Sequence, residues 1–185
     1  MTTAAPNLDW ARNRVDEAFA NTTVGEFLTG QHTDGRTAEH SMWLVTTEFP
    51  TIAADLVELL GGTATRPLTT TSAQIAVETQ APDVLVVLDG PEALTCALVQ
   101  QAATTALVPA ISVRFQLADA RQLGAFDFKS TSWNLAETIM DVQQDLAQND
   151  GPSLCKLSLQ LVRFRARNGV EMAFRKPSLT VLRGL

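Results

Sequence analysis

The 185-residue sequence contains no tyrosine, two cysteines and two histidines, and these shortages limit the chemistry that it can support. Zinc sites need clustered cysteines, histidines or carboxylates. Cys96 and Cys155 are far apart in the sequence, and His32 and His40 stand in a polar segment without a cysteine nearby, so we predict no metal site. Both cysteines have apolar neighbours, which favours two buried free thiols over a disulfide.

Long apolar runs and a secretory leader are also missing. Residues 1–6 are small and polar, with neither the basic start nor the apolar core of a signal peptide. The longest apolar runs, such as residues 84–88, are far shorter than the ~20 residues of a membrane-spanning helix. We therefore expect a soluble protein of the cytoplasm. A composition of 45% apolar and 18% charged residues is ordinary for a globular chain.

No arrangement typical of a catalytic site is present. The sequence has no G-x-S-x-G motif. Gly61-Gly62 follows a predicted helix, whereas phosphate-binding glycine turns follow a strand. Asp89 is a single carboxylate in an Asp-Gly-Pro turn, and no pair of carboxylates has a spacing that suggests shared acid–base work. We expect no enzymatic activity and no cofactor, and a protein that acts by binding another macromolecule.

Charge is divided unevenly along the chain, whose net charge is −6. Residues 151–185 carry seven Lys and Arg against one acidic residue, Glu171, a net of +6, so residues 1–150 carry a net of −12. Such polarity is typical of a partner-binding face, although a solvated basic face of a sheet has the same composition. The seven basic residues are Lys156, Arg163, Arg165, Arg167, Arg175, Lys176 and Arg183.

The first 40 residues are predicted to lie outside the main domain. Apolar residues at spacings of three and four predict a helix over residues 8–21. Residues 24–28 are expected to add a short turn of helix, and the polar, glycine-containing residues 30–40 are expected to form a loop. The predicted organisation is a helical appendage over residues 1–30, a linker over 31–40 and an α+β domain over 41–185.

Strands and helices alternate in the predicted main domain. Strands are expected over 41–49, 73–79, 84–88 and 111–117 and from Gly124, with Phe126 and Phe128 on one face. A helix is expected from Pro50 to the stop at Gly61-Gly62, with a buried stripe of Ile52, Leu56, Leu59 and Leu60. A second helix is expected over 133–147 after a Ser132 cap, with a stripe of Leu135, Ile139, Val142 and Leu146. Residues 92–107 suit either a helix or an irregular connection. The predicted fold class is α+β with a mixed, mostly antiparallel sheet, packed helices and a C-terminal β-hairpin; residues 111–182 would also suit a partly open barrel of the oligonucleotide-binding type.

The hairpin joins residues 153–167 to 170–182 across Asn168-Gly169, a strong turn signal. A three-residue loop places Phe164 and Phe174 on one shared face, whereas a two-residue loop puts arginines opposite Phe174. A one-residue slip exchanges the two faces, and each large apolar side chain left in water forfeits about 1.5–3 kcal/mol. We therefore predict the three-residue loop, with both phenylalanines buried.

This register displays Arg163 and Arg165 on the outer face of the hairpin, with Arg167 at its tip. We predict that the basic residues of the hairpin bind the partner; they are Arg163, Arg165, Arg167, Arg175 and Lys176. Single-strand nucleic-acid binders pair such charge with stacking aromatics. Trp43 and Trp133 are expected in the core, however, and tyrosine is absent.

Three ordered groups of residues carry a resemblance to a known family. The first contains Trp43-Leu44-Val45-Thr46-Thr47, Leu60-Gly61-Gly62, Val77-Glu78-Thr79 and Val87-Leu88-Asp89-Gly90-Pro91. The second contains Phe115-Gln116-Leu117-Ala118, Leu123-Gly124-Ala125-Phe126-Asp127-Phe128, Ser130-Thr131-Ser132-Trp133 and Leu135-Ala136. The third contains Leu157 to Leu161, Asn168-Gly169, Lys176-Pro177 and Leu179-Thr180-Val181-Leu182. In this order they resemble the recombination directionality factors of actinobacterial phages, which are accessory proteins of large serine integrases. The resemblance covers most of residues 41–182.

The resemblance implies a regulator without catalytic activity of its own. It implies that the protein binds a large serine integrase on attachment-site DNA, redirects the integrase's coiled-coil arms and favours attL × attR excision over integration. Members of the family carry a longer insert with clustered cysteines and histidine after the Asp-Gly-Pro turn, whereas this chain has Cys96 alone there. Two other classes stay open, a single-strand nucleic-acid-binding protein and a phage assembly protein, as do direct DNA contact and homo-oligomerisation.

Overall fold

A computed structural model describes residues 22–29, 42–66, 73–100, 106–165, 167 and 169–185. The described residues form, in chain order, β1 (Thr23–Thr29), β2 (Trp43–Thr47), α2 (Pro50–Leu60), β3 (Thr63–Thr65), β4 (Ile75–Glu78), β5 (Asp83–Leu88), η2 (Pro91–Ala93), β6 (Leu94–Gln100), β7 (Leu107–Leu117), η3 (Arg121–Leu123), β8 (Ala125–Ser130), α3 (Trp133–Ala147), β9 (Ser153–Arg165) and β10 (Glu171–Gly184). None of the helices in these ranges is long and apolar enough to cross a membrane.

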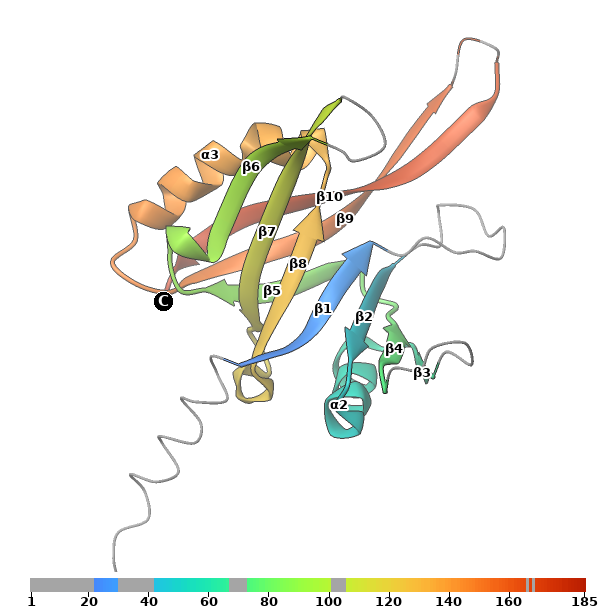
Figure 1. Ribbon diagram of the computed structural model, residues 1–185, viewed down its shortest axis with the longest axis vertical. Helices are drawn as coiled ribbons and strands as arrows, with labels where there is room; N and C mark the ends of the chain where they lie inside the picture. The colour runs from blue at the N-terminus through green and yellow to red at the C-terminus, as the bar shows by residue number, and fades with distance from the viewer. Residues whose placement is uncertain (1–21, 30–41, 67–72, 101–105, 166, 168) are drawn as a thin grey trace, which may run out of the picture.

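The ten described strands belong to one sheet (Figure 1). Their order is β10-β9-β5-β7-β8-β1-β2-β4-β3, with β6 paired to β7 beside this path. The described pairings are antiparallel except for that of β1 with β8. The predicted α+β class with a mixed, mostly antiparallel sheet is confirmed. The strand order is an open path that does not return to its start, so these strands do not close into the barrel that residues 111–182 would also have suited.

Strand β1 lies in the middle of the sheet, between β2 and β8. Val24 and Phe27 are buried, and a register shift between Thr23 and Gly25 interrupts the regular alternation of the strand. The shift leaves the buried side chains three residues apart, a spacing that resembles a helix in the sequence. The predicted turn of helix over residues 24–28 is therefore wrong, and these residues are part of the main sheet. The predicted helix over 8–21 and the linker over 31–40 lie outside the described residues.

Helix α2 begins and ends where the sequence predicted. Pro50 occupies the first turn, where a missing N–H costs nothing, and Gly61 and Gly62 follow the last turn with φ values of 69° and 104°. The helix packs on β2, β3 and β4. Its buried residues are Ile52, Ala53, Leu56 and Leu60, whereas Leu59, predicted as part of the stripe, is exposed.

Helix α3 buries the four residues that its periodicity predicted, Leu135, Ile139, Val142 and Leu146. It contacts β6, β7 and β10, and Gln143 Nε2 donates a hydrogen bond to the Leu94 carbonyl at 2.9 Å. Trp133 is 52% exposed, so its predicted core position is wrong. It stands at the first helical position, two residues before the buried stripe begins.

Strand β6 occupies residues 94–100 of the segment that the sequence left undecided between helix and irregular chain, and residues 101–105 of that segment lie outside the described ranges. Its six residues after Leu94 are exposed, because among the described strands β6 pairs with β7 alone. Cys96 is exposed there while Cys155 is buried, so the prediction of two buried free thiols is correct for Cys155 and wrong for Cys96. The sequence did not predict β3, a three-residue strand with every residue exposed.

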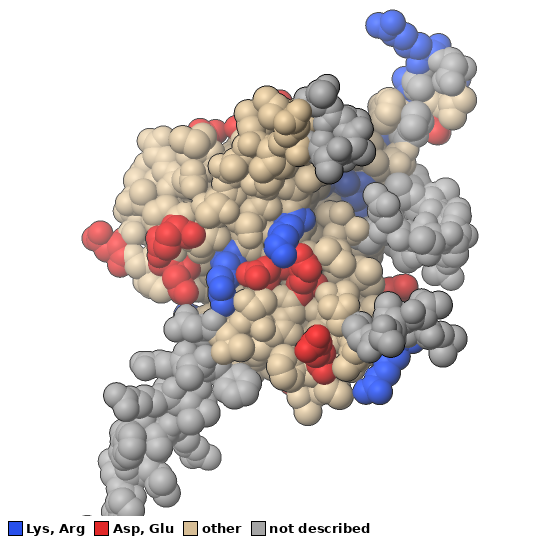
Figure 2. Space-filling model, viewed as in Figure 1, with Lys and Arg blue, Asp and Glu red and all other residues tan. Residues whose placement is uncertain are grey.

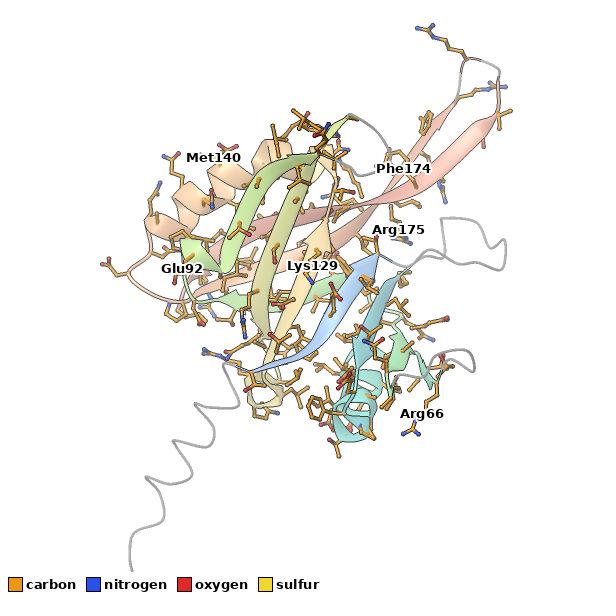
Figure 3. The ribbon with its side chains drawn as sticks, in the orientation of Figure 1. Arg66, Glu92, Lys129, Met140, Phe174 and Arg175 are labelled. Atoms are coloured by element: carbon orange, nitrogen blue, oxygen red, sulfur yellow. The ribbon has the colours of Figure 1, made fainter. Side chains whose placement is uncertain are left out.

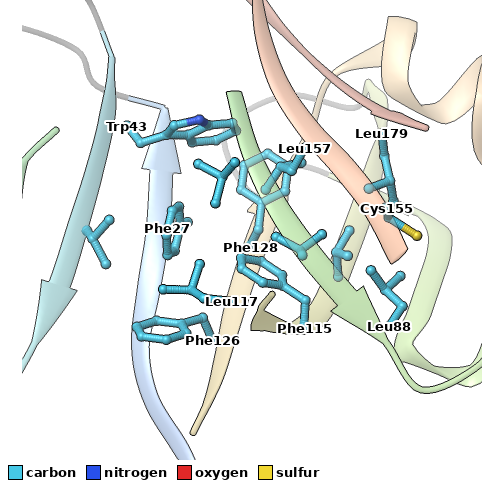
Figure 4. Close-up of a cluster of buried hydrophobic side chains, with 14 of the residues drawn as sticks. Phe27, Trp43, Leu88, Phe115, Leu117, Phe126, Phe128, Cys155, Leu157 and Leu179 are labelled. Atoms are coloured by element: carbon cyan, nitrogen blue, oxygen red, sulfur yellow. The ribbon is translucent and has the colours of Figure 1, made fainter. Parts of the chain in front are cut away.

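Five aromatic side chains from β1, β2, β7 and β8 form the centre of the core (Figure 4). Phe27 makes edge contacts with Trp43, Phe115 and Phe126, with ring centroids 5.9, 5.3 and 5.5 Å apart. Trp43 also meets Phe128 at 5.3 Å, and its Nε1 donates a hydrogen bond to the Pro82 carbonyl at 3.1 Å. The predicted core position of Trp43 is confirmed, and Phe126 and Phe128, which were predicted to share a face, are both buried.

Candidate functional site

The hairpin of β9 and β10 projects from the body of the protein (Figure 1). The first half of β9, Ser153 to Ser158, pairs with both β5 and β10. From Gln160 to Arg165, β9 pairs with β10 alone among the described strands. We call this projecting part, residues 160–165 together with 169–176, the arm.

The register of the arm is the one that the three-residue loop predicted. Glu171 pairs with Arg165, and Phe174 pairs with Val162. Gly169 has a φ of 82°, the left-handed conformation required at the end of this loop. Asn168 lies outside the described residues.

The prediction that the two phenylalanines of the arm share a face is correct, but the prediction that they are buried is wrong. Phe164 is 44% exposed and Phe174 is 40% exposed. Their rings pack edge to face, with centroids 6.1 Å apart and an interplanar angle of 76°. The prediction assumed that a second layer covers the apolar face of the hairpin. The arm extends past the sheet, where the described residues provide no such layer.

The opposite face of the arm carries exposed arginines, as predicted. Arg163 and Arg165 are exposed two residues apart on β9, and Arg167 is exposed in the loop. Arg165 Nε donates a hydrogen bond to the Gly169 carbonyl at 3.1 Å. Figure 2 shows Lys and Arg side chains at the tip of the arm. The arm therefore presents an apolar face and a cationic face to solvent.

A groove of about 800 Å³ lies at the root of the arm. Its lining residues come from β1, β6, β7, β8, the start of α3 and β10, and they run from Thr29 to Pro177, which are 148 positions apart in the sequence. The lining includes three cations, Lys129, Arg175 and Lys176, and the apolar Phe174 and Pro177 (Figure 3). Small and hydroxyl side chains supply most of the rest: Thr29, Thr95, Ala97, Ala110, Ser112, Ser130, Thr131 and Ser132.

Two of the three cations make polar contacts within the protein. Lys129 Nζ lies 3.2 Å from Glu26 Oε1 on the neighbouring strand β1. Arg175 Nη1 donates a hydrogen bond to the Leu159 carbonyl at 3.0 Å, across the two strands at the root of the arm. Arg175 and Lys176, predicted from the sequence, thus share a groove with Lys129, which the sequence did not single out. No periodicity or motif connects Lys129 with the arm, because the sheet brings them together.

The remaining motif residues that the sequence singled out serve the fold. Gly61 and Gly62 end α2 and begin the return to β3. Asp89 and Gly90 form the turn between β5 and η2, where the Ala93 N–H donates to the Gly90 carbonyl at 3.2 Å. His32 and His40 lie outside the described residues. Within the described ranges, no three side chains among His, Cys, Asp and Glu gather in a way that could hold a metal ion.

No solved structure matches the chain. A family model described as Gp3-like, recombination directionality factor-like, matches residues 24–181. The match begins within β1 and ends within β10, so it includes the whole described sheet apart from the extreme ends of these two strands. The chain therefore belongs to the recombination directionality factor-like family.

Proposed function

We propose that this protein binds a large serine integrase in the cytoplasm and favours attL × attR excision over integration, without catalysis of its own. Membership of the recombination directionality factor-like family supports regulation of recombination. The projecting arm is the observation that carries the proposal of direct binding. An isolated two-stranded hairpin is marginally stable in water, and this one exposes phenylalanines on one face and arginines on the other.

The arm has the composition of a binding hot spot. Aromatic side chains and arginine are enriched where most of the energy of protein–protein interfaces is concentrated. Phe164 and Phe174 offer apolar area that a partner can bury, and Arg163, Arg165 and Arg167 offer charge that can select and orient it. We place the partner contact on both faces of the arm, whereas the sequence pointed to the basic face alone.

Binding by such a surface can redirect an enzyme through a shift of populations. The regulator stabilises whichever arrangement of the integrase–DNA complex it binds more tightly. Reversing an equilibrium from 1:99 to 99:1 takes about 5.5 kcal/mol of differential binding. A few buried hot-spot side chains supply energy of this size, because single ones contribute about 2 kcal/mol or more.

A recombination assay with purified components tests the proposal. The serine integrase encoded beside this protein would be incubated with attL and attR substrates, and separately with attP and attB substrates, with and without this protein. We expect excision product to appear and integration product to decrease as the protein is added. Unchanged yields of both products across the titration would contradict the proposal.

A further inference from the structure

Two ribbons of the sheet flank the groove. One is the β6–β7 ribbon, and the other is the arm; Figure 1 shows both extending from the same side of the body. In the register of β6 with β7, Thr95 pairs with Ser112 and Ala97 pairs with Ala110. All four side chains line the groove. They form a patch of small residues, against which another backbone element can approach closely.

The facing wall is formed by residues 174–177 of β10. Phe174 belongs to both the groove and the apolar face of the arm, where it contacts Phe164. Phe174 therefore links the groove to the apolar face of the arm. Arg175, Lys176 and Lys129 add positive charge around the same groove.

The volume of the groove is comparable with that of a short helix. An α-helix with its side chains is about 10 Å across with a rise of 5.4 Å per turn, so each turn occupies about 400 Å³. The groove volume of about 800 Å³ equals that of about two such turns. Helices that dock in this way present apolar residues at i, i+3 and i+4 to the groove.

We infer that the groove between the β6–β7 ribbon and the arm binds an amphipathic, acidic α-helix of the protein partner. Its apolar side packs against Ala97, Ala110 and Phe174, and its carboxylates lie beside Arg175 and Lys176. The inference rests on the proposed function, because the partner is the integrase. It adds the site on this chain and the chemistry of the segment that occupies it.

Nucleic acid fits this surface less well than a protein helix. Single-strand binders present the faces of their aromatic rings to the bases. Phe164 and Phe174 instead pack edge to face against each other, at an interplanar angle of 76°.

Two matched pairs of variants test the inference. Ala97→Trp fills the floor of the groove, whereas Leu98→Trp places the same ring on the opposite face of β6, where Leu98 is 58% exposed. Lys176→Glu reverses a charge in the groove, whereas Lys156→Glu reverses one on β9 beside Asp83, outside it. Affinity of each full-length variant for the purified integrase would be measured by biolayer interferometry, after circular dichroism confirms its fold.

We expect Ala97→Trp and Lys176→Glu each to weaken binding about tenfold or more, which corresponds to about 1.4 kcal/mol, while their controls bind like the wild type. Hydrogen exchange of the integrase should show protection in a helix rich in Asp and Glu. Equal affinities of all variants, or protection of a basic or extended segment of the integrase, would overturn the inference that the groove binds an acidic helix, while leaving the proposed function intact. Failure of the wild-type protein to bind the integrase at all would overturn both.

Discussion

At the scale of single residues, Gly62 has the least freedom to change. Its φ is 104°, and a Cβ there would lie 1.8 Å from the Glu78 carbonyl oxygen. A left-handed non-glycine residue costs about 1–2 kcal/mol, and overpacking adds about 1–3 kcal/mol. We expect Gly62→Ala to lower the free energy of unfolding by about 3 kcal/mol or more in urea titrations.

Gly169→Ala is the matched control for this prediction. Gly169 also has a positive φ, 82°, but a Cβ there meets nothing within 4 Å. Gly169→Ala should therefore lower the free energy of unfolding only by the cost of a left-handed alanine backbone, about 1–2 kcal/mol. Equal destabilisation by both substitutions would mean that the approach of Glu78 has no energetic effect.

The two cysteines differ in their environments. Burial raises the pKa of the Cys155 thiol to about 12, whereas Cys96 is exposed. In the unfolded chain the thiol ionises near pH 8.5. The stability that comes from keeping Cys155 protonated is therefore complete below about pH 8.5 and is lost as the pH rises toward about 12.

We expect the free energy of unfolding to fall by up to about 1.4 kcal/mol per pH unit above pH 9 through this group. A Cys155→Ala variant, measured by urea titration at pH 8 to 10, should lack that part of the slope. Ellman's reagent should label one thiol in the native protein, and none in native Cys96→Ser. Rapid labelling of native Cys96→Ser would show that Cys155 is accessible.

Phe27 and Phe164 have the same side chain in opposite environments. Phe27 is fully buried among aromatic rings, and its truncation to alanine should cost about 3–5 kcal/mol. Phe164 is 44% exposed, so Phe164→Ala should cost about 1 kcal/mol or less, rather than the core penalty that its alternation with arginine predicted. Thermal and urea unfolding of both variants would measure the difference.

At the scale of elements, substitutions on the exposed faces of the arm are expected to weaken binding of the partner without destabilising the fold. We expect Arg163→Glu combined with Arg165→Glu to leave the melting temperature within a few degrees of the wild type, because both side chains are exposed on a projecting hairpin. The same double variant should lose binding to the integrase and stimulation of excision. A large fall in the melting temperature would show that these side chains stabilise the body of the protein.

The elements that the sequence predicted best are those whose pattern is local. Helix α3 was predicted down to its four buried residues because an exposed face and a buried face alternate every turn. The register of the arm was predicted because the turn residues and the alternation of the strands permit one pairing. Strand β6 was left undecided because it is exposed on both faces, so no periodicity distinguishes strand from helix.

At the scale of the whole molecule, β1 decides where the folded domain begins. It lies between β2 and β8 and contributes Phe27 to the centre of the core. We expect a protein lacking residues 1–30 to be much less stable than one lacking residues 1–21, because the longer deletion removes β1. Circular dichroism melts of the two truncations would measure this difference. Equal stability of the two would indicate that the folded domain begins at residue 41, as the sequence predicted.

The α+β class, the two described helices, the pairing in the arm and its basic face could be predicted from the sequence, because each depends on residues that are neighbours in the chain or across one turn. The fold was needed to show that β1 is central, that Phe164 and Phe174 are exposed, and that Lys129 joins Arg175 and Lys176 around one groove. Alternation shows which side chains share a face, but burial depends on whether another layer covers that face. That layer comes from distant parts of the chain, and beside the arm the described residues provide none.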